Sequence, residues 1–291
     1  MAEPYFIKLP VFTYANTTCR NLTRRAKLAN TLVNNPIQFY PYEVSSGMRA
    51  DVLSYAYYND SYMDWLIYLT NGIQDPYYDW YLSENDFASF IQKKYGSFEE
   101  SQRRIKHYEL NWPDDGVEIT PVRYQSLAQE LRKYYTPRFG QGSRVISYHR
   151  LQQDWVVNTN KILTINVNVI TDNVFANGEL VKFKDGGEFV GEAEIIVANT
   201  DYIIVKNITG NTSSNTASIG GLTSFANAEL LDTNTLDEII SDVEFAFWTP
   251  VTVYEWERSK NESNKNIYLL DASQSMKVSE NLRKAMSEKK R

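Results

Sequence analysis

The chain has 291 residues, which is enough for about two domains and for a full hydrophobic core. Its single cysteine, Cys19, excludes an internal disulfide, and two histidines without a cysteine cluster exclude the common zinc spacings. A net charge of −6 argues against nucleic acid as the main partner, because no global field draws the chain to phosphate. The first residues contain no long apolar run, so we expect neither a secretory signal nor a membrane span.

Aromatic residues make up 14% of the chain, and 21 residues are tyrosines, a composition suited to wide, rigid contact surfaces. Charge is spread unevenly along the sequence. Residues 160–245 contain four lysines, no arginine and thirteen acids, a net charge of −9, whereas residues 246–291 have a net charge of +3. The chain therefore has a neutral first zone, an acidic second zone and a basic third zone.

The first zone opens with an extended, tyrosine- and threonine-rich stretch that runs through Tyr42. A short helix is then expected near residues 49–58. Ser61 as N-cap and Gly72 as the terminating residue predict a second helix over residues 62–71.

Two more helices follow in chain order. Ser83 as N-cap and Gly96 as the stop predict a helix between them. Thr120 as N-cap and Pro121 at the first helical position predict another. The apolar side of this last helix would carry Tyr124, Leu127, Leu131 and Tyr134.

The second zone changes to short, β-branched, alternating runs, and seven of the 13 glycines fall between Gly178 and Gly221. This pattern predicts a small antiparallel barrel or sandwich, closed because exposed edge strands are a liability. The third zone starts with a strand-like aromatic run and ends in a basic amphipathic helix. The apolar stripe of that helix is Val278, Leu282, Ala285 and Met286.

The expected fold class is α+β, with flanking helices, extended arms and an inserted β module. Five regions are predicted: an extended N-terminal arm (1–36), a first domain with its following helix (37–110), a helical connecting region (111–159), an acidic β-rich module (160–225), and a C-terminal region of aromatic strands and the amphipathic basic helix (226–291).

No group of side chains in the sequence has the pattern of a known catalytic site. His107 is expected on a solvated helix face, and neither it nor His149 has the spacing of a nucleophile partner or metal ligand. Cys19 has no motif around it, and "KDGGEF" lacks the spacing and following helix of a phosphate-binding loop. We therefore predict a binding or structural protein and no enzyme, with no catalytic residue, metal ligand or cofactor.

The stretch from Phe39 to Ser83 reads as a strand, two short helices and a second strand after the turn at Asp75 and Pro76. Its Tyr-x-Val strand, the glycine before an apolar helix, and Asn71 before the Asp-Pro turn resemble a LysM module. The resemblance implies a βααβ domain within residues 37–110. Since LysM modules bind polymers of N-acetylglucosamine, it also raises sugar stacking as a role for the nearby aromatic residues.

A wider set of residues on both sides of the acidic zone resembles the baseplate wedge subunit of contractile-tailed bacteriophages. The residues that carry this resemblance are Asp51, Trp65, Asn71, Asp75-Pro76, Tyr78-Asp79-Trp80, Trp248, Pro250, Val251, Tyr254, Glu255, Glu262 and 266–271. The resemblance covers about residues 1–110 and 245–285, so the β-rich module interrupts it as an insertion of unassigned role.

The resemblance implies a non-enzymatic subunit that joins neighbouring wedges around the tail hub. Its expected partners are other baseplate wedge subunits, with the tail hub as a further candidate, in a hetero-oligomeric ring without nucleic acid or membrane. Its expected location is the tail baseplate of the virion, after assembly in the host cytoplasm.

Partner docking is predicted for the aromatic cluster, the third-zone aromatics and the C-terminal stripe. These residues are Tyr77, Tyr78, Trp80, Tyr81, Trp248, Tyr254, Trp256, Val278, Leu282 and Met286. The arm from Tyr5 to Thr18 fits strand addition to a partner sheet, and the C-terminal helix is expected in a partner's groove. The alternative function is a LysM-type peptidoglycan-binding module that recruits a lytic complex, although a single module would hold a glycan weakly.

Overall fold

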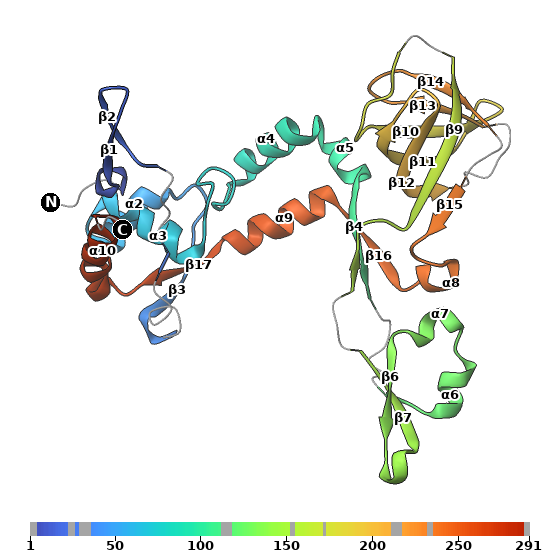
Figure 1. Cartoon of the computed structure of the whole chain (residues 1–291), viewed down its shortest axis with the longest axis horizontal. Coiled ribbons are helices and arrows are strands. Elements are labelled where there is room, and N and C mark those ends of the chain that lie inside the picture. The colour runs from blue at the N-terminus through green and yellow to red at the C-terminus, as the bar shows by residue number, and fades with distance from the viewer. Residues whose placement is uncertain are drawn as a thin grey trace. The chain divides into compact units, whose positions relative to one another are not determined.

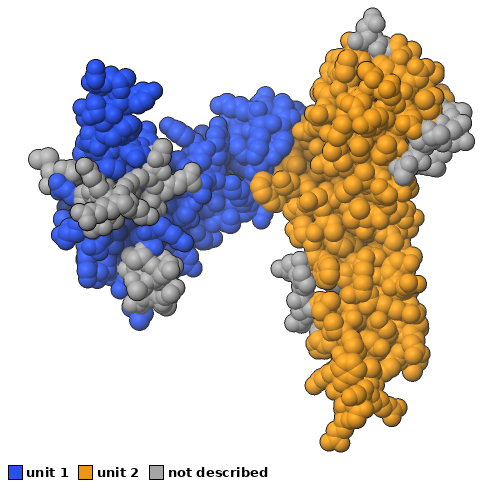
Figure 2. Space-filling view, in the orientation of Figure 1, with its two compact units in different colours: residues 1–97, 257–291 blue, residues 98–256 orange. Residues whose placement is uncertain are grey.

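The computed structural model describes residues 5–22, 27–28, 36–111, 118–151, 155–170, 173–210, 217–231 and 235–287. The chain divides into two compact units (Figure 2). Unit 1 contains residues 1–97 and 257–291, and unit 2 contains residues 98–256. In the described residues, no helix combines the length and the apolar composition that crossing a membrane requires.

Unit 1 joins the two ends of the chain around a small sheet of two antiparallel strands, β3 and β17 (Figure 1). Its elements are η1 (Tyr5–Lys8), β1 (Val11–Tyr14), β2 (Thr17–Arg20), η2 (Pro36–Gln38), β3 (Phe39–Glu43), α2 (Ala50–Tyr58), η3 (Ser61–Met63), α3 (Asp64–Asn71), α4 (Glu84–Tyr95), the later part of α9 (Val253–Asn264), β17 (Asn266–Leu270) and α10 (Ala272–Ser287). In the sheet, Tyr42 pairs with Ile267 and Tyr40 with Leu269.

The core of unit 1 depends on both ends of the chain. One buried cluster contains Val44, Leu53, Ile67, Ile267 and Leu269, which come from β3 and its exit, α2, α3 and β17. A second cluster packs residues of α3 against α10 and the segment after η1, and its members are Leu9, Leu28, Met63, Trp65, Leu66, Leu270 and Leu282. Burial of these side chains requires residues 257–287 to fold together with the N-terminal part.

The strand expected after the Asp-Pro turn does not form. Residues 72–83 are turns and irregular backbone, and the strand that pairs with β3 is β17, from the far end of the chain. Asp75 and Asp79 explain the difference, because their hydrogen bonds use backbone groups that a strand would need. A contiguous βααβ segment is thus wrong for this chain, and its LysM-like character stays a prediction.

Local capping signals set the helix ends in unit 1. Ser83 Oγ accepts a hydrogen bond from Asp86 N at 3.3 Å, and Gly96 ends α4 as predicted. Gly72 has φ +67°, the left-handed conformation that suits a glycine at a helix C-terminus. The predicted N-cap Ser61 is wrong: Asp60 Oδ1 accepts from Tyr62 N at 2.9 Å, and a short 3-10 turn, η3, precedes α3.

Unit 2 contains a β-barrel, two three-stranded sheets and short helices (Figure 1). Its elements are α5 (Phe98–Arg103), β4 (Ile105–Leu110), β5 (Glu118–Ile119), α6 (Pro121–Ser126), α7 (Gln129–Arg132), β6 (Tyr135–Phe139), η4 (Gln141–Ser143), β7 (Val145–Arg150), β8 (Val156–Val157), β9 (Lys161–Val169), β10 (Leu180–Asp185), β11 (Glu188–Ala198), β12 (Tyr202–Gly210), β13 (Ala217–Gly221), β14 (Asn227–Leu230), β15 (Thr235–Glu238), α8 (Asp242–Phe245), β16 (Trp248–Thr252) and the start of α9.

The barrel closes through six strands in the order β12-β11-β10-β13-β14-β9, with β12 and β9 paired to complete the ring. The strand β15 adds to β9. Alternate residues point inward, among them Leu163, Ile165, Ile203 and Val205, and together they form an apolar core. The sequence left a barrel and a sandwich open, and the structure has the barrel. Its last strand in the ring, β14, ends at Leu230.

The connecting region is less helical than predicted. The helix that begins at Pro121 ends at Ser126, because Leu127 and Ala128 are extended, and α7 is a separate single turn. Tyr134 therefore lies outside any helix and is buried beside Trp248 and Ile240. The strands β6 and β7, which follow Tyr134, form an antiparallel sheet with β5, which precedes α6.

The predicted helical position of His107 is also wrong. His107 is a buried residue of β4, the central strand of the sheet β16-β4-β8. Its Nε2 lies 2.9 Å from Glu109 Oε1, so the ring has a polar partner within its own strand. A central strand buries side chains on both faces, which is why a sequence with helical spacing is extended here.

Candidate docking surfaces

The aromatic turn, residues 75–81, is fixed by two carboxylates. Asp75 Oδ1 accepts from Tyr77 N at 2.9 Å, and Asp79 Oδ2 accepts from Asp75 N at 3.1 Å. Lys260 Nζ, on α9, donates to Asp79 Oδ1 at 2.9 Å. The turn is therefore held by its own side chains and by the C-terminal segment.

The four aromatic residues of this turn divide between core and surface. Trp80 is only 7% exposed, and its indole Nε1 donates to the carbonyl of Met48 at 2.7 Å. Tyr81 is half-buried against the same core cluster. Tyr77 and Tyr78 are 79% and 51% exposed, and the Tyr78 ring lies 5.3 Å from that of Phe90. Two of the four predicted docking residues are thus presented to solvent.

Side-chain amides attach the C-terminal segment to this domain. Asn71 Oδ1 accepts from Tyr268 N at 2.8 Å, and its Nδ2 donates to Tyr268 O at 2.9 Å, as a neighbouring strand would. Asn261 forms the same two-way contact with the backbone of Leu82. The buried carboxylate of Glu257 accepts from Lys94 Nζ at 2.6 Å and from Tyr95 OH at 2.7 Å. The aromatic turn consequently belongs to a braced scaffold.

The electrostatics of unit 1 agree with this bracing. The hydrogen bond from Lys260 is the main reason that the pKa of Asp79 is lowered, so its stabilising contribution is present above the ordinary value and fades as pH falls below it. Burial raises the pKa of Tyr68 to about 12 and that of Tyr58 further. Both phenols are neutral at physiological pH.

The N-terminal ribbon, β1 and β2, forms a hairpin where a single extended arm was predicted. Ala15 and Asn16 both have positive φ, as a two-residue type I′ turn requires. Phe12 and Tyr14 lie on one face with their partners Cys19 and Thr17, and both rings are exposed. A lone two-stranded hairpin is marginally stable in water, so this apolar ribbon is a second candidate docking surface.

The base of the ribbon is anchored in unit 1. Leu9 is buried, and Arg20 Nη1 donates to the carbonyl oxygens of Ile7 and Leu9. Asn21 N donates to Pro10 O at 2.9 Å. The ribbon thus leaves the core at a fixed point, although its own strands bury little.

The C-terminal stripe packs within the chain. Leu282 is buried and Val278 is half-buried against Leu9 and Trp65 of the second core cluster. The side chain of Met286 lies outside the described residues. The side chain of Leu282 is therefore not available to enter a partner's groove. This corrects the predicted docking of α10 at that residue.

The third-zone aromatics also have contacts within unit 2. Trp248 is buried with Tyr108 and Tyr134. The Tyr254 ring meets Phe98 edge-on at 4.8 Å, and Lys106 Nζ lies 4.5 Å from the centre of the Trp256 ring. Trp248 is a core residue, while Tyr254 and Trp256 are half-buried and keep some exposed surface.

Several residues that brace these surfaces have no signal in the sequence. Asn261 and Glu257 are polar residues in a charged helix, and only their distant partners reveal their roles. The ribbon had a usable signal, an asparagine between the aromatic run "VFTY" and the threonines of "TTCR". Across the described parts of the chain, no group of three or more histidine, cysteine, aspartate or glutamate side chains is arranged to hold a metal ion.

Comparison with known families identifies one similarity. The family model of base plate wedge protein 53 matches residues 10–111, which is 102 of the 291 residues. The matched segment contains the ribbon, β3, α2, α3, the aromatic turn and α4 of unit 1, and then α5 and β4 of unit 2. No curated protein and no solved structure matches the chain. The similarity supports a phage baseplate wedge subunit.

Proposed function

We propose that the protein is a non-enzymatic structural subunit of a phage tail baseplate that joins neighbouring wedge proteins around the tail hub. The observation that carries the proposal is the match to base plate wedge protein 53 over residues 10–111. The packing of residues 257–287 with the N-terminal part adds support, because the resemblance to wedge subunits includes both segments. Its location would be the tail baseplate of the virion.

Two surfaces of unit 1 would contact the other wedge subunits. The ribbon offers an exposed aromatic face and, in the described residues, two strand edges that pair with no third strand, so it suits addition to a partner's sheet. Tyr77 and Tyr78 offer amphipathic rings on a turn that is already ordered, which lowers the entropic cost of binding. The ribbon would supply main-chain pairing and the tyrosines a rigid contact.

The ribbon gives the test of this function. Replacing both Phe12 and Tyr14 by glutamate is expected to lower the amount of protein recovered with purified tail baseplates by about tenfold or more, because two exposed anchor rings are lost. The free energy of unfolding should change by less than about 0.5 kcal/mol, since both rings are exposed. Recovery is measured by quantitative mass spectrometry of baseplates assembled with each variant.

Thr13→Glu is the matched control, because Thr13 lies on the opposite face of the same strand and is also exposed. It should be recovered like the wild-type chain. Normal recovery of the Phe12 and Tyr14 variant would contradict docking by the ribbon. If the wild-type chain instead pelleted with peptidoglycan sacculi and a Tyr77→Ala, Tyr78→Ala variant did not, the aromatic turn would be a sugar platform and the structural role would fail.

A further inference from the structure

Unit 2 carries two regions of opposite charge. Residues 118–151, which form the sheet β5-β7-β6 and its helices, contain six arginines and lysines and two acids, a net charge of +4. Residues 160–245, which include the barrel, have a net charge of −9. Figure 1 shows the β6–β7 hairpin and the barrel on opposite sides of the sheet formed by β4 and β16. An ion pair of 2.9 Å, from Lys133 Nζ to Glu244 Oε1, joins the two regions, and the ends of the hairpin and of the barrel lie away from it (Figure 1).

The hairpin tip, defined by Arg138, Phe139, Arg144 and Ile146, combines apolar and basic side chains. Phe139 and Ile146 are 59% and 53% exposed. Arg144 is exposed and has no ion-pair partner in the described parts of the chain, and Arg138 has only Glu118, at 3.7 Å. Arginine beside exposed aromatic and aliphatic groups is the composition of interface centres.

The rest of the hairpin is already packed, which confines the open surface to the tip. Tyr148 of β7 stacks on Tyr124 of α6 with ring centres 3.6 Å apart and planes 3° apart. Ser147 Oγ donates to the carboxylate of Glu118 on β5. Near its base the hairpin is thus supported by α6 and by β5, and Phe139 and Ile146 lie beyond these contacts.

The barrel end, defined by Ile170, Val174, Asp201, Phe225 and Glu229, has the complementary composition. Phe225 and Val174 are 72% and 75% exposed, and Asn173 Nδ2 donates to Phe225 O at 3.5 Å. Ile170 N donates to Asn227 O, and Val167 N donates to Asp201 O, both at 3.0 Å, so these residues border the end of β9. Apolar groups at the barrel end are therefore flanked by carboxylates.

The buried carboxylate of Glu179 fixes this surface. Its Oε1 accepts from Thr223 N at 2.7 Å and from Ser224 N at 2.6 Å, and its Oε2 accepts from Ala176 N at 3.1 Å. The loop before β10 and the loop between β13 and β14 are thereby tied together. Phe225, whose φ is +56°, is presented from a braced loop.

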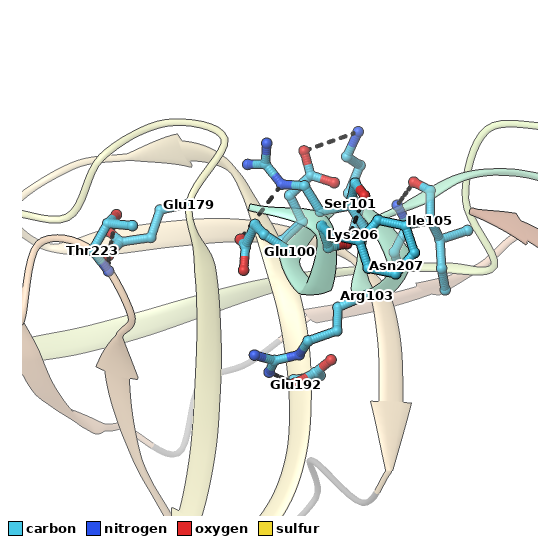
Figure 3. A network of polar contacts seen from close by, with 12 residues as sticks. Glu100, Ser101, Arg103, Ile105, Glu179, Glu192, Lys206, Asn207 and Thr223 are labelled. Carbon is cyan, nitrogen blue, oxygen red and sulfur yellow. Dashed lines mark hydrogen bonds and ion pairs between the residues drawn. The ribbon is translucent and has the colours of Figure 1, made fainter. Parts of the chain in front are cut away.

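The acids of the barrel wall differ from those of the barrel end. On the wall, Arg103 pairs with Glu192 (Figure 3). Lys206 lies nearby, with its Nζ 3.6 Å from Glu194 Oε1. Asp201 and Glu229 are exposed, and among the described residues neither forms an ion pair with a lysine or an arginine. Carboxylates without a cation partner in the described parts of the chain thus lie at the end that also exposes Phe225 and Val174.

From this complementarity we propose that the hairpin tip of one copy binds the barrel end of a second copy. The two surfaces differ, so the contact is head-to-tail and generates a closed ring or an open chain of copies. The proposal rests on the proposed function only in that a baseplate ring holds several copies side by side. It assigns to the inserted β module a role in contacts between copies.

Sedimentation velocity of the full-length protein over a concentration series tests the contact. The wild-type chain should associate at low ionic strength and dissociate as salt is added, because exposed charges are screened. Arg138→Glu with Arg144→Glu, and separately Asp201→Lys with Glu229→Lys, should each weaken association by about tenfold or more. Arg123→Glu reverses a charge on α6, which lies within residues 118–151 but outside the hairpin tip. This control should leave the association unchanged.

Mixing the two reversed variants distinguishes a head-to-tail contact from any other. The mixture contains an intact tip with an intact barrel end and a reversed tip with a reversed barrel end. Both contacts join opposite charges, so the mixture should associate although neither variant does so alone. A chain with all four substitutions should associate again. A wild-type chain that stays monomeric throughout the series, or a mixture that stays monomeric, would overturn the proposal. Normal recovery of the hairpin-reversed variant in baseplates would then show that the proposed function is independent of it.

Discussion

Replacing Trp80 by alanine is expected to destabilise unit 1 by about 3–5 kcal/mol, the usual cost of removing a large aromatic side chain from a core. Trp80 is buried, its ring meets Tyr68 edge-on with centres 6.0 Å apart, and its Nε1 satisfies the carbonyl of Met48. The substitution leaves a cavity and removes the hydrogen bond to the Met48 carbonyl. Urea unfolding followed by far-UV circular dichroism measures the change.

Tyr77→Ala is the matched control from the same turn. Because Tyr77 is 79% exposed, its loss should change the free energy of unfolding by less than about 0.5 kcal/mol. The comparison also determines how assembly defects are interpreted: a Trp80 variant that fails to assemble has lost its fold, whereas a Tyr77 variant that fails has lost a contact. Equal stability of the Trp80 variant and the wild-type chain would contradict the core assignment.

The elements that the sequence predicts well are those whose causes are local. Ser83 and Gly96 bound α4 because an N-cap hydroxyl and a left-handed glycine act within one turn of the helix. The alternating runs after residue 160 predict strands for a similar reason, since the period of two depends only on neighbours. Closure into a barrel follows from the need to cover edges.

The elements that sequence analysis misplaces depend on distant partners. The strand that pairs with β3 is β17, and no pattern near Tyr42 indicates that Ile267 will lie beside it. Trp80 and Tyr77 have the same local composition around them, and only the position of Met48 separates core from surface. His107 reads as helical because its neighbours do, yet β16 and β8 enclose its strand. Long-range contacts override local propensity in each case.

A second large effect is expected at Glu179. Glu179→Gln should destabilise the barrel by about 2–4 kcal/mol at neutral pH, because a neutral amide replaces a buried carboxylate that accepts several hydrogen bonds. Burial is the largest single influence on this carboxyl and raises its pKa, but the hydrogen bonds from Ser224, Ala176 and Thr223 together outweigh burial and leave the pKa lowered. Differential scanning calorimetry measures the stability of each variant.

The lowered pKa fixes the pH dependence. A carboxyl with a lowered folded pKa contributes stability that is fully present above its ordinary value of 4.5 and is lost as pH falls through the folded value. The stability difference between the wild-type chain and Glu179→Gln should therefore be constant above about pH 5.5 and shrink below the ordinary pKa. Glu229→Gln, at an exposed site, should show neither the loss nor the pH dependence. A difference that grew on acidification would mean that Glu179 is protonated in the folded barrel, and the loops that present Phe225 would need another explanation.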